Sequence, residues 1–537
     1  MENAIYIRSH ELCYLKNSCR LVTHIEELGK PYDLFFEVDL SYAPFLVTET
    51  ADAAVYLVLM YALRNGYDII SDIPVTSEFM HNIKEVLIPS LMLGDNTLHQ
   101  INIVAPLVDI DFHGQAVGTA VSCGVDSFYT IKQYLKTEYR RMKLTHLFIT
   151  SSSVDLWQSN AKDLDEYKKH FPVLFDRYSK VAQELNLPLV VGYSNYMEYL
   201  YNVKRIRYHQ SVHHYITMAN ILCLRKLWRI YYFSSSEPFT IFDLIDNSKK
   251  ATSRHELLSM HILSLPDFNC YSTGGSISRE DKTIALADFE VATKYLHPCF
   301  RPNTPKNCSN PSCAKCLRAL LALDIHDKLP LFTQVFDIDK YTRNKIKYFT
   351  RACELKNDDF IGPLYPKLQK KYPELMKRAQ VVFAKQQQME SYWSDIVKNI
   401  SGKLPKNLSI GKNLKGSSLL IQINQIDPKI HYQLTYKKNH LLIGFHCHTE
   451  SLLQHCEPLL QKIESIYNNV ETIRSNNTID IKVPVSNISS ELINFFEKTN
   501  VDTSALQAIE ELKAVPVVTN RTSTKPCKNQ DNYLREL

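Results

Sequence analysis

The feature that most constrains the fold of this chain is an alternation between about residue 109 and residue 335, where apolar strand-like runs are followed by helix-like segments. The strand-like runs read VGTAVS, LTHLFITSS, LPLVVGYS and RIYYFSSS, with helices expected over 127–141, 166–185 and 209–228. Because the runs are apolar at consecutive positions, both of their faces should be covered. The alternation therefore predicts an α/β fold with a parallel sheet and helices on both faces.

The 537 residues are too many for one ordinary core, so several domains are expected. The first part contains YDLFFEVDLSY and LHQINIVAPL as strand-like runs around a helical stretch at 52–65, and the chain after 336 becomes charged and helical. Later, SLLIQIN and NHLLIGFHCH suggest strands, with a helix at 451–467. The expected organisation is an N-terminal α/β domain at 1–108, the central domain at 109–335, a helical segment at 336–400, a small α+β domain at 401–515 and a flexible tail at 516–537.

Composition narrows the class of protein. The formal net charge of +5 is compatible with anionic substrates or with RNA, and because the basic runs are short a dedicated nucleic-acid binder is not favoured. The N-terminus lacks a long apolar run, and the apolar stretch at 54–63 is too short to cross a bilayer. We expect a cytoplasmic protein that does not associate with membranes, whose thirteen cysteines are thiols or metal ligands rather than disulfides.

The sequence SCGVDS at 122–127 joins the first strand-like run of the central region to a helix. Such a junction presents several backbone N–H groups together with the positive end of the helix dipole, which suits a phosphate group. Ser122 and Ser127 add hydroxyl donors, and Gly124 allows close approach of a ligand. Asp126 is expected to orient Mg²⁺ or to hold the loop. An ordinary helix cap would also begin with a serine, which is the alternative interpretation.

Four cysteines lie close together in the segment HPCFRPNTPKNCSNPSCAKC, with the spacing C-x8-C-x4-C-x2-C. Four thiolates meet the tetrahedral preference of Zn²⁺, and a C-x-x-C pair that opens a helix is common in zinc sites. A site with four protein ligands leaves no open position, so its expected role is structural. His297 is a weaker candidate ligand. The expected zinc ligands are Cys299, Cys308, Cys313 and Cys316.

The SCGVDS segment resembles the S-G-G-x-D-S motif of the PP-loop, or N-type, ATP pyrophosphatases. Those enzymes bind ATP, attach AMP to a carboxylate or carbonyl oxygen and release pyrophosphate. Cys123 stands where the family usually has glycine, and its side chain could crowd the phosphates if the position requires a positive φ. The resemblance implies that ATP, with Mg²⁺, would be bound by Ser122, Cys123, Gly124, Val125, Asp126 and Ser127.

The loop together with the later cysteines is similar to 7-cyano-7-deazaguanine synthase and its wider relatives over about residues 110–330. That family has C-x8-C-x2-C-x2-C, whereas the middle gap here is four residues. The flanking regions are not part of that synthase, so its substrate does not transfer. The overall arrangement looks more like longer multidomain relatives.

The same resemblance points to two further groups of residues. Arg279 and Lys282, in YSTGGSISREDKT, would approach ATP or substrate, with Asp126 and Ser127 as the other expected catalytic residues. The alternative is a solvated helix start capped by Ser278. In this family the end of the second central strand contacts adenine through its backbone, which implicates Ile149, Thr150 and Ser151.

These observations predict an ATP-dependent adenylating enzyme that activates a small carboxylate or nucleobase-like substrate, which ammonia or an amine then captures. A second hypothesis is a tRNA-modifying sulfurtransferase, with Cys223 or Cys270 as the sulfur carrier. A third is a nucleotide-sensing component of a multiprotein system, which binds protein partners through its flanking domains and lacks chemistry of its own.

Overall fold

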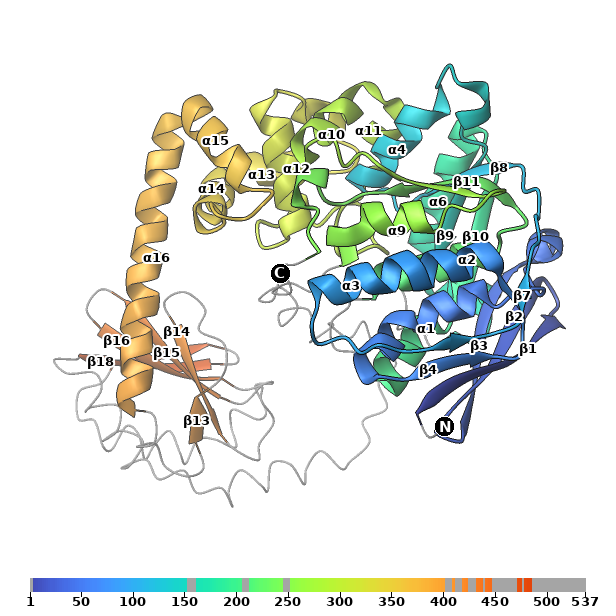
Figure 1. The fold of residues 1–537 in the computed structure, drawn as a ribbon. Coiled ribbons are helices and arrows are strands. Elements are labelled where there is room, and N and C mark those ends of the chain that lie inside the picture. The colour runs from blue at the N-terminus through green and yellow to red at the C-terminus, as the bar shows by residue number, and fades with distance from the viewer. Residues whose placement is uncertain are drawn as a thin grey trace. The chain divides into compact units, whose positions relative to one another are not determined.

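The computed structural model describes residues 3–151, 161–204, 212–244 and 252–400, together with six strands between residues 408 and 484 (Figure 1). The chain forms two compact units, Met1–Ala379 and Gln380–Leu537. Across the part of the chain that is described, no helix has both the length and the apolar character needed to cross a membrane.

Five parallel strands form the centre of the first unit: β8 (Ala116–Ala120), β9 (His146–Thr150), β10 (Leu189–Ser194), β11 (Trp228–Ser234) and β12 (Asn269–Thr273). Their spatial order is β12-β11-β8-β9-β10, and each neighbouring pair is parallel. If these five strands are numbered 1 to 5 in chain order, from β8 to β12, their spatial order read from β10 is 3-2-1-4-5, which is a doubly wound order. The order changes direction between β8 and β11, and ligands in such sheets bind beyond the carboxyl ends of the strands at this point.

Helices cover both faces of the parallel strands, as the alternation predicts (Figure 1). On one side α4 packs against α10, which also contacts α12, and α6 contacts α11. On the other side α8 packs against α1, and α9 contacts β12. The bounds are α1 (Asp52–Asn65), α4 (Val125–Leu135), α5 (Leu164–His170), α6 (Pro172–Leu185), α7 (Tyr196–Glu198), α8 (His213–Leu222), α9 (Glu256–Ile262), α10 (Arg279–Ala285), α11 (Glu290–Tyr295) and α12 (Ala314–Ile325).

The sheet continues into the first hundred residues instead of stopping at β10. Strand β3 (Lys30–Asp39) pairs antiparallel with β10, followed by β2 (Ser18–Glu27), β1 (Ala4–Tyr14), β4 (Asp68–Ser71) and β6 (Ile103–Val104), which makes ten strands. Gly192 in β10 makes room for the ring of Phe36, because a side chain at Gly192 would lie 2.6 Å from that ring. The boundary expected at residue 108 therefore does not separate two sheets, and one core of buried side chains draws on both sides of it.

Local sequence explains several elements around this sheet. Helix α1 has the expected bounds and ends at Gly66, whose φ of +66° suits a helix end. Leu28 and Gly29 both have positive φ, as a tight two-residue turn between β2 and β3 requires. The helix expected over 166–185 is two helices, α5 and α6, and Pro172 opens the second because proline suits a first helical position. Three short elements complete this region: α2 (Ser77–His81), α3 (Ile88–Gly94) and a two-stranded pairing of β5 (Val75–Thr76) with β7 (Leu107–Val108).

The helical stretch after residue 336 consists of α13 (Ile338–Arg343), α14 (Lys345–Glu354), α15 (Tyr365–Lys371) and α16 (Pro373–Ile400), and residues up to Ala379 belong to the first unit. The second unit contains an antiparallel sheet in the order β13-β14-β15-β16-β18-β17. Its strands are β13 (Leu408–Ile410), β14 (Ser418–Ile423), β15 (His431–Lys437), β16 (His440–His446), β17 (Glu471–Ser475) and β18 (Thr478–Pro484). The helix expected at 451–467 and the tail expected at 516–537 lie outside the described residues.

Candidate functional site

The loop between β8 and α4 is braced by its own side chains. The hydroxyl of Ser122 donates to the hydroxyl of Ser127 at 3.1 Å and accepts from the backbone N–H of Gly124 at 3.3 Å. The hydroxyl of Ser127 in turn donates to the carbonyl of Gly124 at 3.2 Å. Gly124 is extended and precedes the first residue of α4. The loop therefore leads directly into a helix N-terminus at the point where the strand order changes direction.

Cys123 has a φ of +55°, so the backbone here does adopt the conformation that favours glycine. Its thiol, however, is fully buried and is not among the groups that line the neighbouring pocket. Burial raises the pKa of this thiol to about 12, with a small opposing effect from Arg177. The carbonyl of Cys123 accepts a hydrogen bond from the backbone N–H of His297 at 2.7 Å. The cysteine side chain thus points into the core and leaves the face of the loop open.

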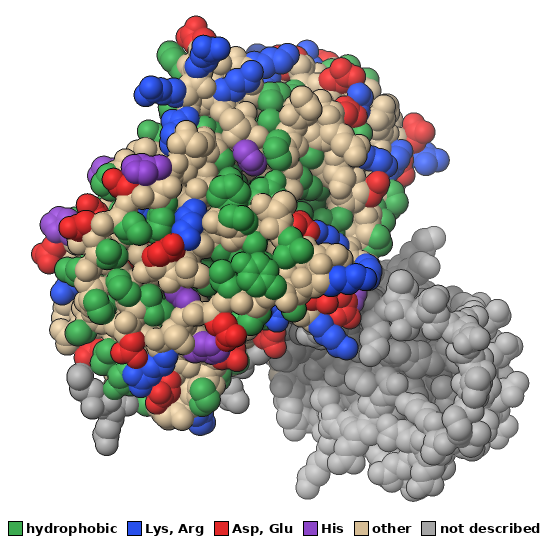
Figure 2. Space-filling model, turned by 90° about the vertical axis from the view of Figure 1, so that its right-hand side faces the viewer, with side chains coloured by type: hydrophobic (Ala, Val, Ile, Leu, Met, Phe, Trp, Pro, Cys, Tyr) green, Lys and Arg blue, Asp and Glu red, His purple; other side chains and the backbone are tan. Residues whose placement is uncertain are grey.

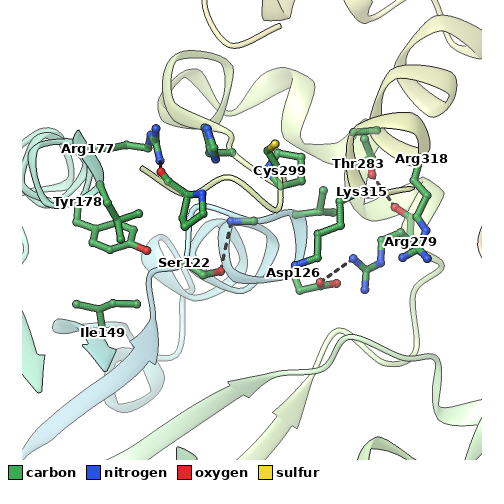
Figure 3. Close-up of a pocket in the computed structure, with 17 residues that line it drawn as sticks. Ser122, Asp126, Ile149, Arg177, Tyr178, Arg279, Thr283, Cys299, Lys315 and Arg318 are labelled. Carbon is green, nitrogen blue, oxygen red and sulfur yellow. Dashed lines mark hydrogen bonds and ion pairs between the residues drawn. The ribbon is translucent and has the colours of Figure 1, made fainter. Parts of the chain in front are cut away.

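A pocket of about 180 Å³ lies over this loop (Figure 3). Figure 3 shows Ile149, Arg177 and Tyr178 at one end, Arg279 and Arg318 at the other, and Ser122 and Asp126 between them. The pocket is lined by Ser122, Gly124, Val125, Asp126, Ile149, Leu174, Arg177, Tyr178, Arg279, Thr283, His297, Pro298, Cys299, Pro302, Lys315, Arg318 and Ala319.

Asp126 lies between two cations from α10. Its carboxylate is 3.0 Å from Nη1 of Arg279 and 3.1 Å from Nζ of Lys282. Lys282 is almost fully buried and also donates to the carbonyl of Ser235 at 2.9 Å. The turn at Gly274 has a φ of +80°, and a side chain there would lie 3.2 Å from Cε of Lys282. The structure thus brings together three of the four expected catalytic side chains.

The alternative interpretation of the α10 start is correct in its cap but not in its solvation, because Lys282 and Glu280 are buried. Ser278 caps the helix by accepting from the backbone N–H of Asp281 at 3.0 Å. A capped helix start and a basic contribution to the pocket are compatible, because the cap fixes the first turn from which Arg279 extends into the pocket, whereas the buried Lys282 is not among the lining groups.

Of the three residues at the end of β9 that were expected to contact adenine, one lines the pocket. Ile149 lines the pocket, whereas Thr150 and Ser151 are buried and are not among the lining groups. The hydroxyl of Ser151 donates to the carbonyl of Ser194 at 3.1 Å and accepts from its N–H at 3.0 Å. Ser151 therefore ties the ends of β9 and β10 together.

The four expected metal ligands are assembled. The sulfur atoms of Cys299, Cys308, Cys313 and Cys316 all lie within 4.8 Å of one another, and those of Cys308 and Cys316 are 3.6 Å apart. Zn–S bonds of about 2.3 Å in a tetrahedron imply sulfur separations of about 3.8 Å. The donor set and its spacing therefore fit a metal ion such as Zn²⁺.

His297 is not part of this group of ligands. Its Nε2 lies 3.3 Å from the hydroxyl of Thr304, and burial lowers the pKa of its imidazole to about 4. Together with the bond from its N–H to Cys123, these contacts give His297 a role in joining the cysteine loop to the loop after β8.

Sequence reasoning missed four cationic or aromatic residues of the pocket. Arg177 and Tyr178 come from α6, and Lys315 and Arg318 come from α12. Arg177 donates to the carbonyl of Pro302 at 3.1 Å and to that of Thr304, and so holds the cysteine loop against α6. The only sequence signal was the position of Lys315 and Arg318 on the helix that the C-x-x-C pair opens.

Basic groups outnumber acidic ones around this pocket. Its lining contains Arg177, Arg279, Lys315 and Arg318, with Asp126 as the single carboxylate. This balance suits an anionic ligand. The face shown in Figure 2 does not share this excess of basic groups. Acidic and basic side chains are interspersed over most of its described surface, and it lacks the basic stripe typical of nucleic-acid binders.

Cys223 and Cys270 lie away from these features. Both are buried, and burial raises the pKa of Cys223 to about 12 and that of Cys270 well above its ordinary value. The hydroxyl of Tyr196 lies 3.2 Å from the sulfur of Cys223. Neither thiol is poised to act as a nucleophile, because the reactive form is the thiolate.

Comparisons of the chain with protein-family models, with curated proteins and with solved structures found no match.

Proposed function

We propose that this protein is an ATP-dependent adenylating enzyme of the PP-loop ATP pyrophosphatase type. One observation carries the proposal: a glycine-containing, serine-braced loop leads into a helix N-terminus where the order of the parallel strands changes direction, and a basic pocket lies over it. Strand order, loop and charge each favour a phosphate-bearing ligand. The resemblance of the loop to the PP-loop motif supports an acceptor that offers a carboxylate or carbonyl oxygen.

The pocket suggests how ATP would lie. The base would be near Ile149 and Tyr178, and the phosphates would follow the loop from Ser122 towards Arg279 (Figure 3). Magnesium, which offsets phosphate charge when bound, would draw on Asp126 in competition with Arg279 and Lys282. Zinc would be held by the four cysteines, and its contribution would be to stabilise the loop that carries Cys299 and His297.

In the proposed reaction, an oxygen of the acceptor attacks the α-phosphorus of ATP. The bond from that phosphorus to the bridging oxygen breaks, and the electron pair leaves with pyrophosphate. Lys282 and Arg279 would offset the charge that develops on the leaving group. Ammonia or an amine then attacks the activated carbon, and AMP departs. No covalent bond to the protein is required, so catalysis rests on positioning and electrostatics.

The two alternatives differ in their support. The sulfurtransferase hypothesis needs a reactive thiol, and both proposed carriers are buried with raised pKa values. The nucleotide-sensing hypothesis shares the pocket and differs only in the absence of turnover. Catalysis is preferred because the PP-loop motif that the loop resembles belongs to enzymes that release pyrophosphate.

The test is the exchange of labelled pyrophosphate into ATP, measured with mixtures of small carboxylates and nucleobase acids. Wild-type protein should catalyse exchange, and Asp126→Asn should lower the rate by about 100-fold or more, the usual size of an electrostatic contribution in an active site. Asp39→Asn, which alters a carboxylate paired with Lys168 away from the pocket, is the matched control. ATP binding without exchange for any acceptor class would favour the nucleotide-sensing role instead.

A further inference from the structure

Two arginines at one end of the pocket share a single aromatic ring. The guanidinium carbon of Arg318 lies 4.2 Å from the ring centroid of Phe360, and that of Arg279 lies 4.9 Å from the same centroid. Arg279 comes from α10 and Arg318 from α12, whereas Phe360 belongs to the turn between α14 and α15. An aromatic face attracts cations and stacks well against a planar guanidinium. The ring therefore holds two like charges close together.

Asp358 fixes the position of this ring. One oxygen of its carboxylate accepts from the backbone N–H groups of Phe360 and Ile361, both at 2.9 Å. The other oxygen lies 3.8 Å from Nη2 of Arg318. A strong charged hydrogen bond between such groups measures about 2.8 Å, so this contact neutralises Arg318 only weakly. The turn thus presents an aromatic platform with a loosely held counter-ion, and the half-buried Glu237 is a second carboxylate that interacts with both arginines.

Each arginine also has a donor that is not satisfied by the described residues. The Nε atoms of Arg279 and Arg318 are buried there without a hydrogen-bond partner. The terminal nitrogens of Arg279 already contact Asp126 and the carbonyl of Ser236. A buried donor without an acceptor is destabilising, and an ion, water or ligand that supplies the acceptor is one explanation for it.

We infer that Arg279, Arg318 and Phe360 form a subsite for a phosphoanion, which receives the pyrophosphate end of the nucleotide. The orientation of that nucleotide rests on the proposed function, whereas the subsite is defined by the two arginines and the ring. Pyrophosphate carries more oxygens than a carboxylate and can accept from both guanidinium groups at once. On binding, the anion would replace the weak contact between Arg318 and Asp358.

The experiment is calorimetric titration of the full-length protein with inorganic pyrophosphate, with AMP and with citrate. Arg318→Met should lower the affinity for pyrophosphate by about tenfold or more, and Phe360→Leu should lower it by about threefold or more, as expected for losing one desolvated charge or its platform. Asp358→Asn keeps the acceptor for both backbone amides and removes the competing charge. It should therefore raise the affinity by about twofold or more.

Arg343→Met is the matched control, because Arg343 is exposed on α13 and carries the same charge. AMP affinity should stay within about twofold of wild type in every variant, since AMP lacks the distal phosphates. Equal pyrophosphate affinity in the Arg318 and Arg343 variants would overturn the inference. So would a parallel loss of AMP binding, which would indicate a general packing role, or tighter binding of citrate than of pyrophosphate.

The outcome is separable from the proposed function. If pyrophosphate binding depends on Arg318 but the protein has no exchange activity, the subsite is supported and the proposed enzymatic function is refuted. If Arg318→Met shows normal exchange with an unchanged KM for pyrophosphate, the subsite is refuted and the proposed enzymatic function is supported.

Discussion

Cys123 has the most unusual environment of any single residue in the loop after β8. It adopts a left-handed backbone conformation, which costs a residue with a side chain about 1–2 kcal/mol relative to the right-handed one. Its thiol is fully buried, and burial raises its pKa to about 12 from an ordinary value of 9.0. The thiol is therefore shielded although its backbone borders a pocket.

We expect native Cys123 to resist alkylation by iodoacetamide at pH 8. A pKa of about 12 leaves very little thiolate at pH 8, and burial slows access further. Peptide mass spectrometry should find Cys123 unmodified in the native protein and modified after unfolding in urea. Cys13, which is only partly buried, should react first. Comparable rates at the two positions would show that Cys123 is open to solvent.

Residues that act together were predictable only where they are neighbours in sequence. Ser122, Asp126 and the four cysteines carry local signatures, because loop and zinc chemistry depend on short spacings. Arg318 and Phe360 meet through folding from separate segments, and no local pattern connects them. Thr150 and Ser151 were expected near the ligand, yet Thr150 follows Ile149 on the opposite face of β9, and the hydroxyl of Ser151, just beyond the strand, is bonded to the backbone of Ser194.

An irregular segment, from Leu296 to Asn307, links the cysteine cluster to the pocket. The N–H of His297 binds the carbonyl of Cys123, and the N–H of Cys299 donates to the side chain of Asn307 at 3.2 Å. The segment contains no helix or strand, so its shape depends on such contacts and on whatever the sulfur atoms bind.

Removing the metal should therefore loosen this segment. Purified protein should contain about one zinc per chain, because four thiolates make one tetrahedral site. Cys308→Ser should lose most of the zinc, become sensitive to limited proteolysis between residues 296 and 313, and bind AMP about tenfold more weakly. Cys353→Ser, a buried cysteine of α14 outside the cluster, should keep its zinc. Full zinc in the Cys308 variant would exclude that residue as a ligand.

Element prediction succeeded where the signal is local. Helix α1 has clear apolar content and a glycine at its end, and its bounds match the expectation. Strands β1 and β2 were missed, because β1 has exposed polar positions and β2 has buried polar residues such as Thr23 and Glu27, so neither shows a clear apolar pattern. The pairing of β3 with β10 joins segments about 150 residues apart, which no local period can reveal.

For the whole first unit, the continuous ten-stranded sheet determines what can fold alone. The core cluster combines side chains from α1, β3 and β10 with those of α8, so cutting the chain at residue 108 divides a single core. The compact unit ends at Ala379, which includes the helices that carry Phe360 towards the pocket.

A fragment of residues 1–379 should therefore unfold in one cooperative thermal transition, whereas a fragment of residues 109–335 should be insoluble or should lack such a transition. Circular dichroism and near-ultraviolet spectra would compare the two. A stable 109–335 fragment with native-like spectra would show that β3 and α1 are dispensable for the core.

The seam between β3 and β10 also limits how copies of this protein can associate. An open row of amide and carbonyl groups is a template on which a foreign polypeptide can add a strand. Because β3 pairs with the backbone groups of β10, the border strands of the ten-stranded sheet are β12 at one edge and the two-residue β6 at the other. Among the described strands of the ten-stranded sheet, templated growth into ribbons or fibrils would therefore begin at β12, where Tyr271 is 41% exposed.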